Sequence, residues 1–73
     1  MGNMRKRSFV LAGHATSVAL EQEFWDTLER YASAERLSLS MLLTRLDNAR
    51  GERPLASACR LAALAFVGRP APT

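Results

Sequence analysis

The segment from Thr16 to Asn48 constrains the fold of this 73-residue chain more than any other segment. It begins with alternating side chains, so that Thr16, Val18 and Leu20 share one face of an extended strand. Two segments with helical spacing follow directly. The backbone donors and acceptors of a single strand need a partner, and the simplest partner is the same strand of a second copy. The segment therefore predicts an obligate homodimer.

The composition favours association as well. A chain of this length buries only about 60% of its unfolded surface when it folds alone. Yet 48% of its residues are apolar, and a subunit interface would cover the excess. The single cysteine, Cys59, excludes an internal disulfide and predicts a cytoplasmic protein. Phe9–Ala12 is too short for a signal peptide, and no apolar run approaches the ~20 residues that span a bilayer, so we expect no membrane association.

Positive charge is concentrated at the start of the chain. The net charge is +3, and residues 1–20 contain Arg5, Lys6 and Arg7 but no acidic residue. Residues 1–7 are therefore predicted to form a flexible basic arm. Two roles are open for this arm: it contacts phosphate groups, or it is a solvated tail that aids solubility.

One feature of the strand stays open. The apolar residues before Gly13 favour an extended segment, but in one unbroken strand Phe9 and Leu11 would face away from Val18. Either Gly13 marks a bulge that exchanges the two faces, or the chain turns back at this glycine as a hairpin. We expect the bulge, and hence a single strand over about residues 15–20.

Three helices are predicted to follow the strand, over about residues 21–34, 38–50 and 54–67. Each span has apolar residues at helical spacing, beginning with Phe24 and Leu28 in the first span. Only two polar residues interrupt the third span after its start, so we expect that helix to be buried on most sides.

The connections between the helices carry their own signals. Ser38 is a suitable N-cap for the second helix, Gly51 fits the position after its end, and Pro54 fits the first turn of the third helix. No glycine follows the first helix, so Arg36 or a neighbour must become left-handed at a cost of roughly 1 kcal/mol. Residues 68–73 are expected to be a flexible tail.

Strand, helix, tight turn and helix together resemble the ribbon-helix-helix fold of the Arc/MetJ/CopG type. The sequence is more closely similar to a small bacterial subfamily with a third helix, over about residues 6 to 67. The segments that carry this resemblance are Lys6-Arg7-Ser8, Ala12-Gly13-His14, Thr16-Ser17-Val18, Leu20-Glu21, Glu23-Phe24-Trp25, Leu37-Ser38-Leu39-Ser40 and Leu55-Ala56-Ser57-Ala58-Cys59-Arg60-Leu61.

The resemblance implies a mainly α fold with one β-strand and an intertwined homodimer. Two chains would share an intermolecular two-stranded antiparallel ribbon that enters the major groove of double-stranded DNA. The implied base-facing residues are Ala15, Ser17 and Ala19. The implied phosphate clamp, at a helix N-terminus, is Ser38, Leu39 and Ser40. The implied dimer core is Val18, Leu20, Phe24, Leu28, Leu42, Leu43 and Leu46.

The sequence departs from this pattern at the base-facing positions. Ribbons that read bases usually present Arg, Lys, Asn, Gln or Thr, whereas Ala15 and Ala19 can offer at most apolar contact with a thymine methyl group. DNA affinity would then depend on Arg5, Lys6, Arg7 and the N-terminus of the second helix, which position a protein on DNA without specifying a sequence.

Two functions follow from these observations. The first is a homodimeric DNA-binding protein that regulates transcription. The alternative is a dimeric protein-interaction or antitoxin-like module without base readout, whose partner docks on the helix at residues 55–67. An enzyme is not expected, because His14 and Cys59 are isolated from any catalytic or metal-binding pattern, and neither a metal nor another cofactor is implied. His14 is interpreted as a turn or packing residue, and Phe24 and Trp25 are interpreted as core residues.

Overall fold

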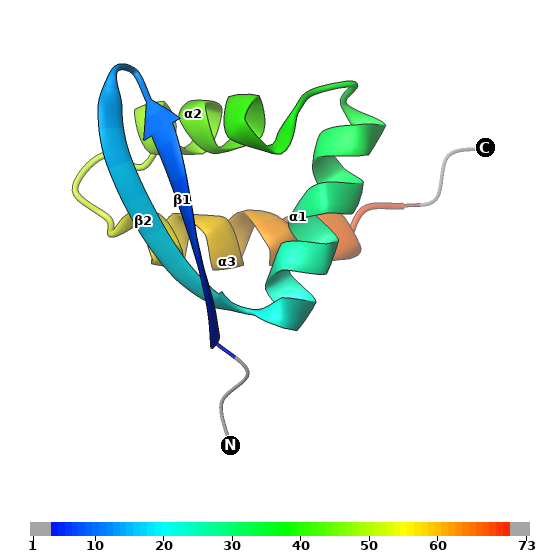
Figure 1. Cartoon of the computed structure of the whole chain (residues 1–73). Coiled ribbons are helices and arrows are strands. Elements are labelled where there is room, and N and C mark those ends of the chain that lie inside the picture. Colours follow the sequence, from blue (N-terminus) through cyan, green and yellow to red (C-terminus); the bar gives the residue numbers. More distant parts are fainter. Residues whose placement is uncertain (1–3, 71–73) are drawn as a thin grey trace.

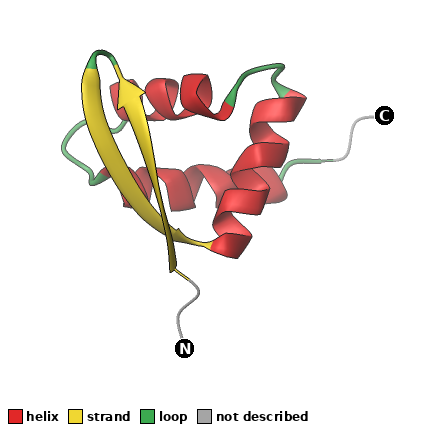
Figure 2. Ribbon diagram, in the orientation of Figure 1, coloured by secondary structure: helices red, strands yellow, loops and turns green. Residues whose placement is uncertain are grey.

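The chain folds into a β-hairpin that lies across two helices, with a third helix beside it (Figure 1). The computed structural model describes residues 4–70. The elements are β1 (Met4–Leu11), β2 (His14–Glu21), α1 (Gln22–Ala34), α2 (Leu39–Ala49) and α3 (Leu55–Val67). Figure 2 shows both strands crossing in front of α2 and α3, with α1 to one side. The expected helices are present within one residue at each end, but the expected single strand is replaced by two.

The chain turns back at Gly13, so the expected bulge is wrong and the hairpin alternative is correct. Only Ala12 and Gly13 separate the strands, and both have positive φ, 52° and 82°. Two left-handed residues in a two-residue loop match the right-handed twist of the flanking strands. Glycine reaches this conformation freely, whereas Ala12 has a Cβ that opposes it.

The antiparallel register explains why the hairpin forms. Leu11 lies opposite His14, Phe9 opposite Thr16, and Arg7 opposite Val18. Cross-strand partners project from the same face of a sheet. The register therefore brings the apolar residues of β1 onto the face where β2 carries Val18, which one continuous strand would not do.

A flexible basic arm was expected over residues 1–7, but the described part of it, residues 4–7, is a β-strand. Met4–Arg7 forms the first half of β1 and pairs with the end of β2, from Met4 opposite Glu21 to Arg7 opposite Val18. Residues 1–3 lie outside the described part of the chain. Hydrogen bonds and side-chain contacts with β2 stabilise this strand, and the composition of residues 4–7 alone does not indicate them.

The ends of the helices are set by local chemistry, much as the sequence indicates. Arg36 has φ of 58°, and its amide donates to the Ser33 carbonyl while the Leu37 amide donates to the Ala32 carbonyl. This is the Schellman pattern, and it confirms the left-handed residue expected after the first helix. Ser38 caps α2 by accepting a hydrogen bond from the Met41 amide at 3.1 Å.

The expected flexible tail is ordered at its start. Residues 68–70 are described, and residues 71–73 lie outside the described part. The Gly68 amide donates to the Leu64 carbonyl, and the Arg69 guanidinium lies 5.0 Å from the Tyr31 ring centre and 3.4 Å from a Glu35 carboxylate oxygen. These contacts hold the end of α3 against α1.

The hydrophobic core closes within a single chain. Hairpin, α1, α2 and α3 all contribute to it, and Trp25 is 1% exposed at its centre. Five residues of the expected dimer core are buried here, namely Val18, Leu20, Leu28, Leu42 and Leu43. The other two, Phe24 and Leu46, are partly buried. Burial of these residues therefore no longer requires an intertwined second chain, and the lone strand that argued for an obligate dimer has a partner in its own chain.

Candidate nucleic-acid interface

The outward side of the hairpin forms a small, mixed surface, which we call the ribbon face. The register and the alternation of side chains put four cross-strand pairs on this side of the hairpin. The pair at the base, Met4 with Glu21, contacts Arg60 of α3. The other three pairs form the ribbon face: Lys6 with Ala19, Ser8 with Ser17, and Val10 with Ala15. The ribbon face thus carries a cation at one end, hydroxyl groups in the middle, and methyl groups next to the turn.

The ribbon face is open over most of its length. Lys6, Ser8, Ala15 and Ser17 are exposed, and Val10 is 68% exposed. The Ser8 and Ser17 hydroxyls lie 3.0 Å apart, and either can donate to the other. The structure thus turns Ala15 and Ser17 outward as expected, whereas the third expected base-facing residue, Ala19, is half-buried.

The three basic residues of β1 do not act on one surface. Lys6 belongs to the ribbon face, but Arg5 and Arg7 alternate to the opposite side of the strand. The Arg7 guanidinium lies over the Trp25 ring, 5.2 Å from its centre, and 3.7 Å from a carboxylate oxygen of Glu29. Arg7 is therefore engaged with α1, so the expected cluster of three free cations is reduced.

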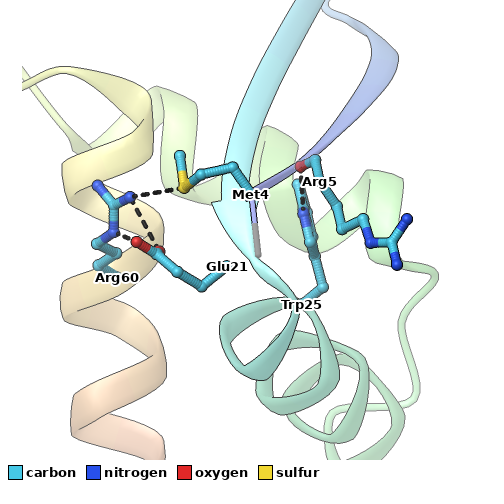
Figure 3. A network of polar contacts seen from close by, with 5 residues as sticks. All are labelled: Met4, Arg5, Glu21, Trp25 and Arg60. Atoms are coloured by element: carbon cyan, nitrogen blue, oxygen red, sulfur yellow. Dashed lines mark hydrogen bonds and ion pairs between the residues drawn. The ribbon is translucent and has the colours of Figure 1, made fainter. Parts of the chain in front are cut away.

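The base of the hairpin is fixed to the helices from two sides, as Figure 3 shows. On one side, the Trp25 indole Nε1–H donates to the Arg5 carbonyl at 2.8 Å. On the other side, Arg60 of α3 donates to Glu21 Oε1 from Nη2 at 3.0 Å and from Nε at 3.2 Å. Both strands are thus anchored where they leave the ribbon face.

The Glu21 carboxylate is held in its charged form. A backbone amide hydrogen bond and the Arg60 guanidinium lower its pKa below the ordinary value of 4.5. Glu21 is the single acidic residue of residues 4–21. Because Arg60 neutralises it, the hairpin presents little negative potential to a polyanion.

The start of α2 offers a second polar site. Ser38, Leu39 and Ser40, the expected phosphate clamp, occupy the N-cap and the first two helical positions. The Ser38 hydroxyl already accepts the Met41 amide, and the Leu39 side chain is buried. The first-turn amides of Leu39 and Ser40 remain, because amides at these positions have no partner inside the helix.

Helix α3 carries an exposed apolar row beside a groove. Leu61, Leu64 and Val67 are 49%, 61% and 67% exposed. Between α1 and α3 lies a shallow apolar cavity of about 310 Å³, lined by Phe24, Thr27, Ala63, Leu64 and Val67 among others. The sequence predicted that α3 would be buried on most sides, but only Leu55, Cys59 and Ala63 are fully buried. We call Leu61, Leu64 and Val67 the α3 row.

His14 and Cys59 lie outside any metal-binding cluster of side chains in residues 4–70. His14 is exposed at the start of β2, beside the turn. Cys59 is fully buried, and this burial raises the pKa of its thiol to about 11. Within residues 4–70, no three His, Cys, Asp or Glu side chains gather as a metal site. None of the helices in that range is long and apolar enough to cross a membrane.

Two residues of the ribbon face were missed from the sequence, Ser8 and Val10. Both lie on β1, and they reach the ribbon face only because β1 folds back on β2. The hairpin alternative, which the alternation of side chains around Gly13 left open, would have found them. A hairpin with a two-residue loop at residues 12 and 13 places Val10 opposite Ala15.

Comparison with known proteins identifies the fold family. A search of curated proteins gives no match. The solved structure of an uncharacterized protein from Bordetella pertussis Tohama I is 38% identical, with a TM-score of 0.77. The match covers 88% of the present chain and 55% of that one, so the chain spans about half the length of that relative. The model of the ribbon-helix-helix domain matches residues 4–67. The chain therefore belongs to the ribbon-helix-helix family.

Proposed function

We propose that the chain is a DNA-binding transcriptional regulator that places its ribbon face in the major groove. Ribbon-helix-helix domains are typically DNA-binding regulators of transcription and not enzymes. The observation that carries the proposal for this chain is the chemistry of the ribbon face. It is open, it holds Lys6 and two hydroxyl groups, and the one nearby carboxylate is neutralised by Arg60.

Shape and charge support this placement. The major groove is about 12 Å wide and admits two β-strands side by side. Ala15, Ser17 and Ser8 have short side chains, so they do not hinder a close approach of the two strands to the groove floor. Lys6 lies toward the end of the hairpin, where a cation contacts a phosphate group of the groove wall.

The amides at the start of α2 supply the second contact in this proposal. A helix N-terminus attracts anions because unpaired amides and the helix dipole both favour negative charge. Ser38, Leu39 and Ser40 would hold a phosphate through their backbone. Arg5 would add a further phosphate contact, whereas Arg7 stays with α1.

We further propose that the active form is a homodimer, as the family usually is. In residues 4–70 the sheet has two strands, so β1 and β2 each keep one edge without a strand partner. These free edges are surfaces at which a second copy can associate. Sedimentation equilibrium over a roughly hundredfold concentration range tests this. A folded monomer throughout would refute the dimer and leave the single-chain fold intact.

The DNA proposal is tested by titrating a labelled duplex with the full chain at about 50 mM and about 200 mM salt. We expect binding at the lower concentration and a steep loss at the higher one, because phosphate contacts release counterions. Lys6→Ala should weaken binding and reduce the salt slope by about one unit for each protomer that contacts the duplex. Arg53→Ala, a charge-matched change in the α2–α3 loop, is the control. Absence of binding at the lower salt concentration refutes the proposal.

A second candidate function rests on the α3 row. Exposed apolar side chains beside a groove are typical of a surface that docks a protein helix. The chain would then be a dimeric interaction or antitoxin-like module. Pull-downs with Leu61→Asp and Leu64→Asp test it, because loss of a partner from these variants, with DNA binding unchanged, would favour the interaction module.

A further inference from the structure

We propose that the Val10–Ala15 pair recognises thymine through its C5-methyl group, so that preferred duplexes carry thymine opposite this pair. This inference rests on the proposed function, because it assumes that the ribbon face enters the major groove. It adds the chemical identity of the base that the face selects.

The geometry makes Val10 and Ala15 one apolar contact site. They are direct cross-strand partners on the ribbon face. Partners of this kind have Cβ atoms about 4.5–5.5 Å apart, so their methyl groups form a continuous patch. Val10 is 68% exposed, more than any other large hydrophobic residue described. An apolar patch that is open on the side facing DNA gains free energy when it covers another apolar group.

The other pairs of the ribbon face offer no apolar group that selects thymine. Ser8 and Ser17 are hydrogen-bonded to each other, and a hydroxyl group donates or accepts equally well, so it tolerates either kind of base edge. Lys6 is a flexible point charge that suits phosphate groups and can also bind guanine O6 or N7, but it offers no apolar contact to thymine. The ribbon face contains no Arg, Asn or Gln.

Thymine is the base that suits the remaining pair. In the major groove it alone among the four bases presents a methyl group, and small apolar side chains contact it. Val10 and Lys6 lie four residues apart on β1, which is about 13 Å at 3.3 Å per residue. That span matches about four base-pair steps of 3.4 Å. A thymine contact near the turn and a phosphate contact at Lys6 are therefore compatible with one stretch of duplex.

The test replaces the thymine methyl group with hydrogen while keeping base pairing. Duplexes with a random core are selected with the full chain at moderate salt, and the selected pool is then synthesised twice, once with thymidine and once with deoxyuridine. Burial of one methyl group is worth about fourfold in affinity. We expect the wild-type chain to bind the deoxyuridine pool at least about fourfold more weakly, and to bind unselected pools of both kinds equally.

Two valine variants make the test specific. Val10→Ala removes most of the apolar patch and should reduce the difference between the two selected pools to less than about twofold. Val67→Ala is the matched control, because Val67 is 67% exposed but lies on α3. It should keep the wild-type difference. Equal binding of the two selected pools by the wild-type chain would overturn the inference, and so would the same response from both valine variants.

The outcomes also separate this inference from the proposed function. If no duplex binds even at about 50 mM salt, the proposed function and the inference both fail. If duplexes bind but no sequence is enriched, or enriched duplexes bind equally with deoxyuridine, the chain binds DNA without reading thymine. Only the inference fails in that case. If Val10→Ala weakens self-association and leaves the thymine preference unchanged, Val10 belongs to a subunit contact and the inference is also wrong.

Discussion

Single residues in strained conformations set the two tight turns. Arg36 is left-handed with φ of 58°, in the Schellman turn between α1 and α2. Replacing it with glycine removes the Cβ clash and should raise the free energy of unfolding by a few tenths to about 1 kcal/mol, as measured by urea denaturation. The control is Arg45→Gly, in the middle of α2, which should lose about 1 kcal/mol. A loss of stability in Arg36→Gly would contradict the role assigned to the turn.

The pair between Glu21 and Arg60 gives stability a defined dependence on pH. The pKa of Glu21 is lowered in the folded chain, so its contribution is fully present above the ordinary value of 4.5 and is lost as the pH falls through the folded value. Thermal unfolding should therefore show Glu21→Gln to be less stable than wild type at pH 7, with the difference shrinking as the pH falls below 4.5 toward the lowered pKa of Glu21. Glu52→Gln, in the exposed loop before α3, is the comparison. A difference between the two proteins that stays constant throughout the acid titration would rule out this origin.

At the scale of elements, the helices were predictable and the hairpin was not. Helical spacing, the Ser38 cap and the residues at the turns are local signals, and each predicted helix is present within one residue. The hairpin depends on pairing between β1 and β2, which is not local. Ala12-Gly13 is a weaker turn signal than Asn-Gly, and Arg5–Arg7 suggests a solvated arm until a partner strand is known. In one unbroken strand, Phe9 and Leu11 would face away from Val18, and either a bulge or a hairpin at Gly13 would correct this.

One hydrogen bond ties the first strand to the first helix. The Trp25 indole donates to the Arg5 carbonyl, and Trp25 is almost fully buried. Trp25→Phe leaves that carbonyl without its donor and leaves a cavity beside it. We expect a loss of about 2 kcal/mol in urea denaturation and faster hydrogen exchange in the first half of β1. Tyr31→Phe, in the same helix, is the control. Unchanged exchange in β1 would mean that this bond does not fix the strand.

At the scale of the whole molecule, the closed core changes the argument for a dimer. An unpaired strand and an excess of apolar residues predicted an obligate dimer from the sequence. In the structure, twelve hydrophobic residues are buried within one chain. What remains for a second copy or another partner is the free edges of the two strands and the α3 row. The ribbon face was predicted in part, because the alternation of β2 places Ala15 and Ser17 outward. Its other half, with Ser8 and Val10, depends on the long-range fold of β1.

The central claim is that the ribbon face is the surface that binds DNA. The most direct measurement is an amide NMR titration of the labelled chain with a duplex at about 50 mM salt. We expect the amide signals of residues 6–10, 15–19 and 38–40 to shift together, whereas those of the α3 row do not. Shifts centred on Leu61, Leu64 and Val67, with the hairpin unchanged, would contradict it.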